Sequence, residues 1–173
     1  MLPERIIRHG HVEPESWQFV GVEPQSTIEP LPDGPIVVPL ALWKAQRDNL
    51  LARGAPVGVW LKPDDEPAEI APDLPWLELV AVHFPKFTDG RGYSIATLLR
   101  KRYGYTRELR AFGDVGRDQL FYLKRVGFDS FGLAPHRDPF KALDSFSDFS
   151  VRYQGAVDDA VPLFRKRPAE GPR

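Results

Sequence analysis

The chain has 173 residues, of which 42% are hydrophobic and 27% are charged, and its net charge is −1. This composition indicates one globular domain with a hydrophobic core, and the lack of a basic excess argues against a nucleic-acid or membrane-surface partner. Because the chain contains no cysteine, it can form no disulfide, no cysteine-ligated zinc or iron–sulfur site and no catalytic thiolate of its own.

The first 34 residues are expected to form an irregular lead-in. Its segments RIIRHG and WQFVG are candidates for two short strands, which we interpret as a hairpin, and a proline-rich stretch follows them. The N-terminus has no apolar segment typical of a secretory signal, and the longest apolar run, WLELVAVHF, is too short to span a membrane. The expected location is therefore the cytoplasm.

Strand-like and helix-like segments alternate from residue 35 onward. The strands are expected at 35–40, 56–61, 76–84, 108–113 and 128–133. The helices are expected at 41–54, 62–75, 93–103, 117–127 and 138–154, the second of them kept short by three prolines. Gly54, Gly104 and Gly127 stand where three of these helices should end.

This alternation predicts an α/β fold with a mainly parallel sheet of about five βα units, right-handed crossovers and helices packed on the sheet. Two architectures fit the pattern: an open doubly wound sheet, and a sheet curved like part of a β/α barrel. We favour the open sheet. The domain should cover residues 35–155, with 156–173 as a polar C-terminal tail, and exposed strand edges would allow a homodimer.

Candidate functional residues gather in the loops after the strands, since ligands of parallel α/β sheets bind beyond the carboxyl ends of the strands. The loop FPKFTDGRGYS, residues 84–94, supplies Lys86, Thr88, Asp89, Gly90, Arg91 and Gly92. The next loop, GDVGRDQ, supplies Asp114 and Arg117, and two other loops supply Lys62, Asp64, Asp65, His136 and Arg137. Loops 84–94 and 113–119 should lie side by side if their strands are neighbours.

The loop 84–94 has two interpretations. As an anion site, Gly90 and Gly92 would turn backbone N–H groups toward a ligand, and Lys86 and Arg91 would add positive charge. As a structural turn, Asp89-Gly90 would reverse the chain and a side chain such as Asp89 would cap the following helix. The spacing matches neither a Walker loop nor the dinucleotide glycine fingerprint.

Other polar residues also have structural explanations. Asp114 either caps the helix that begins near Arg117 or works with Lys86 as an acid/base couple. His83 lies inside an apolar strand, where a hydrogen-bonded core or rim residue is the commoner role. His9 and His11 have no partner at metal-ligand spacing, so we predict no metal.

The aromatic residues divide into two groups. Phe121, Tyr122, Phe128 and Phe131 are expected in the core, whereas Tyr93 and Tyr103 are the expected exposed ones. No cofactor motif is visible, so the sequence predicts no particular cofactor.

The run FPKFTDGRGYSIATLLRKRYGYTRELRAFGDVGRDQLFYLKRVGFDSF, residues 84–131, closely resembles a bacterial family known as domain of unknown function 934. The similarity continues in DFSVRYQGAVDDAVPLF and, more weakly, in DGPIVVPLALWKAQRDNLLARGAPVGVWLKPDDEP. Members are commonly encoded beside assimilatory sulfite and sulfate reduction genes, and some are labelled oxidoreductases. The resemblance therefore implies an uncharacterised accessory protein of sulfur assimilation and carries over no catalytic residue.

Two functions follow as expectations. The first is an accessory protein that binds a partner of sulfite reduction, such as the reductase. The second is a small enzyme or sensor that binds a phosphorylated or sulfated anion at the loop rim, with Lys86 and Arg91 holding it and Asp89 or Asp114 handling protons or a ribose hydroxyl. A true oxidoreductase would need a cofactor to carry electrons, and the sequence shows no motif for one.

Overall fold

Eight strands of the described residues form one sheet. The computed structural model describes residues 2–22, 30–147 and 156–157, and the strands follow the order β2-β1-β8-β7-β6-β5-β4-β3 across the sheet. Their bounds are β1 Arg5–Arg8, β2 His11–Pro14, β3 Gln18–Phe19, β4 Ile36–Pro39, β5 Val57–Leu61, β6 Leu79–Phe84, β7 Glu108–Gly113 and β8 Ser130–Gly132.

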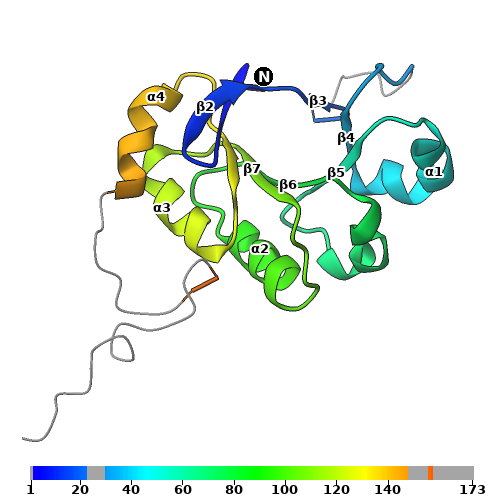
Figure 1. Ribbon diagram of the computed structural model, residues 1–173. Coiled ribbons are helices and arrows are strands. Elements are labelled where there is room, and N and C mark those ends of the chain that lie inside the picture. Colours follow the sequence, from blue (N-terminus) through cyan, green and yellow to red (C-terminus); the bar gives the residue numbers. More distant parts are fainter. Residues whose placement is uncertain (1, 23–29, 148–155, 158–173) are drawn as a thin grey trace, which may run out of the picture.

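The strands from β3 to β8 are parallel neighbours in chain order. With right-handed crossovers, such an order places every connecting helix on the same face, whereas a doubly wound sheet needs a reversal of strand order. The prediction of an open doubly wound sheet is therefore wrong. The sheet instead curls as a half-barrel, with α1, α2 and α3 on its outer side (Figure 1).

The sheet is mixed rather than mainly parallel, because the N-terminal residues add two antiparallel strands. β1 pairs antiparallel with both β8 and β2. The turn between β1 and β2 is His9-Gly10, where both residues have positive φ (50° and 80°), as a two-residue hairpin turn requires. The segment expected to pair with β1, WQFVG, instead contains β3, which lies parallel to β4 at the other edge of the sheet.

The expectation of about five βα units is not confirmed. Between β5 and β6 the chain forms two 3₁₀ segments in place of an α-helix, since three prolines interrupt this stretch. The last expected helix, 138–154, is α-helical for a single turn, and residues 148–154 lie outside the described residues. The helical bounds are α1 Leu40–Ala52, η1 Pro67–Glu69, η2 Ala71–Trp76, α2 Arg91–Lys101, α3 Arg117–Val126, α4 Pro139–Ala142 and η3 Leu143–Ser147.

Locally determined elements agree closely with the sequence pattern. β7 spans the predicted residues 108–113, and α3 lies within the predicted range 117–127. Gly127 ends α3 in the left-handed conformation, with φ at +113° and its N–H donated to carbonyl groups of the last turn.

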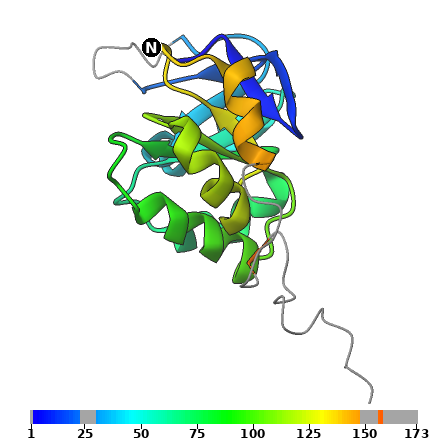
Figure 2. The same ribbon diagram turned by 90° about the vertical axis from the view of Figure 1, so that its left-hand side faces the viewer.

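Each face of the sheet has its own core. Side chains of alternate strand residues pack with α1, α2 and α3 on the outer face. The concave face is covered by the N-terminal chain (Figure 2), and the indole Nε1 of Trp60 donates to the Val20 carbonyl at 2.9 Å. The residues of this second core are Val37, Trp60, Leu79, Ala81 and Phe112, against which Leu2, Trp17, Phe19 and Val22 pack.

A buried ionic network also joins the N-terminal chain to the concave face. The Arg110 side chain is 1% exposed, forms ion pairs with Glu15 and Glu108, and donates to Ser130 Oγ at 3.1 Å. Burial alone would raise the pKa of Glu108, but Arg110 and the Ser130 hydroxyl lower it overall. A buried guanidinium needs such partners because an unpaired charge there would be strongly destabilising.

The exposure of the aromatic residues differs from the prediction at some positions. Tyr122, expected in the core, is 56% exposed, whereas Tyr93 and Tyr103 are partly buried against the outer core. The helical position of Tyr122 explains its exposure, since Gln119, Leu120 and Leu123 form the buried side of α3 and Tyr122 lies on the other side of the helix. Among the described helices, none has the length and apolar character needed to cross a membrane.

Candidate functional site

The two loops predicted to be neighbours are hydrogen-bonded to each other. Asp114 N–H donates to the Phe84 carbonyl at 2.7 Å, and Phe87 N–H donates to the Asp114 carboxylate at 3.0 Å. The Gln119 side chain adds a bond from its amide to the Phe87 carbonyl at 3.0 Å. Loops 84–94 and 113–119 thus form one rim at the carboxyl ends of β6 and β7.

A cavity of about 420 Å³ opens at the same end of the sheet, beside β5 and β6. We call it the β5–β6 cavity. Its wall includes Gly21 and Val22 of the N-terminal chain as well as Trp60. Its polar lining consists of Lys62, Asp64, His83 and Arg91. In parallel β/α proteins this end of the strands is where ligands bind.

Arg91, the first residue of α2, is held by two carboxylates. Asp89 accepts from Nε at 3.0 Å and from the guanidinium NH2 at 2.7 Å, and Asp64 forms an ion pair with NH1. The Arg91 side chain is still 54% exposed. The Arg91 guanidinium lowers the pKa of Asp89 to about 2, and hydrogen bonding to Asp89 raises the pKa of Arg91. Both groups are therefore ionised at neutral pH.

His83, near the end of β6, is half-buried between aromatic rings. Its imidazole stacks on Phe112, with ring centroids 4.9 Å apart, and meets Trp60 edge-on at 5.9 Å. The absence of a side chain at Gly113 makes room for the ring, since a Cβ there would lie 2.9 Å from His83 Cδ2. Burial and the nearby Lys62 charge lower the pKa of His83. The imidazole is therefore mainly neutral at pH 7 and can both donate and accept a hydrogen bond.

Lys62 supplies a second positive charge to the cavity. Its Nζ lies 5.9 Å from the Trp60 ring centroid. Its backbone N–H donates to the Asp65 carboxylate at 2.7 Å, which orders the turn after β5. Within residues 2–22, 30–147 and 156–157, Nζ has no hydrogen bond or ion pair, so its donors face the cavity and solvent.

The two glycines of the predicted anion loop have different surroundings. Gly92 is buried within α2, and a Cβ there would lie 2.4 Å from Cζ of Phe84. Gly90 is the exposed N-cap residue of α2, with open space around its Cβ position. The geometry therefore assigns Gly92 to helix–sheet packing rather than to a backbone cradle.

The remaining predicted residues lie around the cavity without lining it. Lys86 and Thr88 are exposed on the loop before α2. Asp114 is half-buried and bound to the Phe87 N–H, and Arg117 is the exposed first residue of α3. Of the candidates in loops 84–94 and 113–119, Arg91 lines the cavity and Asp89 positions it, and two candidates from the loop after β5, Lys62 and Asp64, line it as well.

The sequence pattern did not single out His83. The sequence predicts a core or rim role for this histidine in an apolar strand. In the structure His83 shares its face of β6 with Leu79 and Ala81 of the concave core, because every second strand residue points to the same side. That alternation is a usable signal only when the strand is known to have two differently covered faces. Lys62 and Asp64 were noted as loop residues, but nothing local connects them with Arg91.

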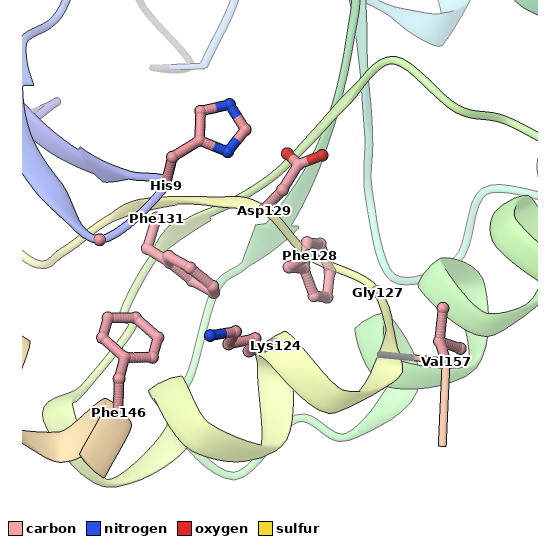
Figure 3. A pocket seen from close by; sticks show the side chains of 9 residues that line it. His9, Lys124, Gly127, Phe128, Asp129, Phe131, Phe146 and Val157 are labelled. Atoms are coloured by element: carbon pink, nitrogen blue, oxygen red, sulfur yellow. The ribbon is translucent and has the colours of Figure 1, made fainter. Parts of the chain in front are cut away.

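A second cavity, of about 530 Å³, lies at the opposite end of the strands, before β8 (Figure 3). Its lining includes the rings of Phe128, Phe131 and Phe146 and the polar side chains of His9, Lys124 and Asp129. Asp129 accepts from Arg100 at 2.7 Å and from the Leu109 N–H at 2.9 Å, and burial raises its pKa. This cavity lies at the amino ends of the parallel strands, whereas the β5–β6 cavity lies at their carboxyl ends, where ligands of β/α proteins bind.

In the described part of the chain, no group of three or more His, Asp or Glu side chains is arranged to hold a metal ion.

Comparison with known families finds a match over the second part of the chain. The model of the family described as "Bacterial protein of unknown function (DUF934)" matches residues 58–164. The match begins in β5 and includes all four polar residues of the cavity lining, but not Gly21 and Val22. No curated protein matches the chain.

Proposed function

Since the chain belongs to the bacterial DUF934 family, whose function is unknown, we propose from the site itself that the protein binds a small organic anion in the β5–β6 cavity. The observation that carries this proposal is the convergence of Lys62, His83 and Arg91 on one cavity at the carboxyl ends of β5 and β6.

The charges and shape of the cavity support an anionic ligand. Arg91 is pre-oriented by Asp89, so little side-chain freedom is lost when it binds an oxyanion. Lys62 adds an ammonium group, and neutral His83 adds a hydrogen-bond donor. The cavity volume of about 420 Å³ lies within the range of small-molecule sites. Because Val22 and Trp60 make part of the cavity wall apolar, the ligand should carry an organic part.

The biological setting that we propose is an accessory role in sulfur assimilation. Its support is the resemblance of residues 84–131, together with the shared chemistry of sulfur oxyanions, which suit arginine and lysine donors. Of these, a nucleotide-linked sulfate such as adenylyl sulfate has an organic part, whereas sulfite has none. Binding of a sulfite-reduction enzyme stays a further proposal of the same kind.

The test is ligand-dependent stability with a matched control. Thermal unfolding is measured with and without each of four anions: sulfate, sulfite, phosphate and adenylyl sulfate. The proteins compared are wild type, Lys62→Gln, Arg91→Gln and Lys86→Gln. A ligand at about 100 times its dissociation constant should stabilise wild type by about 2.7 kcal/mol. The gain should be lost in Lys62→Gln and Arg91→Gln and kept in Lys86→Gln, because Lys86 carries the same charge on the same rim but does not line the cavity.

Equal loss of the ligand effect in all three variants would show that the binding depends on general surface charge and not on the β5–β6 cavity. No stabilisation of wild type by any of the four anions would contradict the proposed function.

A further inference from the structure

Arg91 is shared by two carboxylates of very different character. Asp89 lies two residues before it, accepts from two guanidinium nitrogens and from the Arg91 backbone N–H at 3.2 Å, and its side chain is 13% exposed. Asp64 comes from the loop after β5, 27 residues away, contacts only NH1, and its side chain is 81% exposed.

The two carboxylates also differ in their position relative to the cavity. Asp64 lines it together with Arg91, whereas Asp89 is not among the lining residues. The guanidinium therefore has an inner side fixed by Asp89 and a cavity side occupied by Asp64. An exposed ion pair through a single nitrogen is weak in water and exchanges readily.

We propose that Asp64 occupies the ligand position on Arg91 and is displaced when the anion binds, so that it sets which anions the cavity accepts. This inference rests on the proposed function. A ligand carboxylate that displaced Asp64 would form the same kind of ion pair with Arg91, so little binding free energy would be gained. A phosphate or sulfate group presents more oxygens, which can bond Arg91 NH1 and the Lys62 ammonium together. The ligand class that Asp64 favours is thus a tetrahedral phosphoryl or sulfuryl group over a carboxylate.

Two substitutions that remove the same charge should have opposite effects. Asp64→Asn should free NH1 and tighten phosphate binding about tenfold, because it removes one competing charge-assisted hydrogen bond. Asp89→Asn should weaken binding about tenfold, because Arg91 loses its orientation. Simple electrostatics would make both variants bind more tightly. Glu66→Gln, which removes an exposed charge from the Asp64 loop outside the cavity lining, should change affinity less than about twofold.

The measurements are calorimetric titrations of wild type and these variants with sodium phosphate, sodium sulfate and sodium acetate at constant ionic strength. Asp64→Asn should lower the dissociation constants for phosphate and sulfate. It should lower the dissociation constant for acetate even more, so that the ratio of acetate to phosphate dissociation constants becomes smaller than in wild type. A second readout is carboxyl ¹³C NMR. Adding phosphate to wild type should move the Asp64 resonance toward its position in Arg91→Gln and leave that of Asp89 unchanged.

The outcomes separate this inference from the proposed function. If wild type binds phosphate through Lys62 and Arg91 but Asp64→Asn binds no more tightly, Asp64 is not a competitor and the proposed function stands. If Asp64→Asn and Asp89→Asn both strengthen binding equally, the effect is charge alone and the inference is overturned. If none of the proteins binds phosphate or sulfate, the inference is overturned, and the proposed function is decided by the thermal test with adenylyl sulfate.

Discussion

At the scale of single residues, the chemistry of the site depends on which groups meet. His83 lies in a neutral aromatic setting formed by Trp60 and Phe112, yet beside the positive Lys62. Both the burial and the charge disfavour the imidazolium ion, so its pKa falls below the ordinary value of 6.5. The arrangement keeps a neutral imidazole next to a cationic group, so that its ring N–H can donate a hydrogen bond to an anionic ligand.

Lys62→Gln should raise the pKa of His83 toward its ordinary value, because the Lys62 charge is one of the two causes that lower this pKa, the other being burial. Titration of the His83 ring protons by NMR measures this directly, and Lys86→Gln is the control that should leave the pKa unchanged. An unaltered His83 pKa in Lys62→Gln would mean that Lys62 does not act on the imidazole.

The same shift makes stability depend on pH. Because His83 binds its proton less readily in the folded state, the unfolded state holds more protons as the pH falls below about 6.5. The free energy of unfolding should therefore decrease from pH 7 toward the lowered pKa of His83, and this part of the slope should be absent in His83→Gln.

At the scale of elements, the join between β6 and α2 brings the site residues and the packing together. Gly92 allows α2 to lie against Phe84 of β6, which in turn places Arg91 at the cavity. Only a residue without a side chain fits there, since a Cβ would lie within 3 Å of the Phe84 ring. The DGRG segment is therefore a packing motif that positions a functional arginine.

Gly92→Ala should destabilise the protein by about 1–3 kcal/mol through overpacking, although alanine is the better helix former. Gly90→Ala should change stability by less than about 1 kcal/mol, because its Cβ would meet no other atom within 4 Å. Urea denaturation of both variants provides the comparison. If Gly90→Ala were the more damaging substitution, the packing account of this segment would be wrong.

At the scale of the whole molecule, the N-terminal chain covers the concave face that the half-barrel sheet would otherwise leave open. It covers the concave face with Trp17, Phe19 and Val22, and Glu15 reaches the buried Arg110. The same chain forms part of the cavity wall through Gly21 and Val22. The cavity is therefore a property of the complete fold and not of the rim loops alone.

Arg110→Met should reduce the free energy of unfolding by about 3–5 kcal/mol, because it leaves Glu15 and Glu108 without their buried partner. Arg107→Met, which breaks only the exposed pair with Glu78, should cost less than about 1 kcal/mol. Urea denaturation measures both. Similar costs for the two variants would show that the Arg110 network does not hold the N-terminal chain in place.

The sequence by itself determined the elements whose signals are local. β7 and α3 were predicted at nearly the observed bounds, because apolar periodicity and a terminal glycine depend on neighbouring residues. The neighbouring positions of loops 84–94 and 113–119 also followed, since consecutive parallel strands usually pair. Arg91 and Asp89 were included among the candidates because their loop follows a strand, and ligands of parallel α/β sheets bind beyond the carboxyl ends of the strands.

Only the tertiary structure decided the curl of the sheet, the antiparallel addition of β1, and the meeting of Lys62, Asp64, His83 and Arg91. These features depend on strand order and on which chain covers the concave face. Both are set by contacts between residues far apart in sequence, such as Trp60 with Val20 and Glu15 with Arg110. A local pattern carries no record of such contacts, because each segment would have the same periodicity in an open sheet as in a half-barrel.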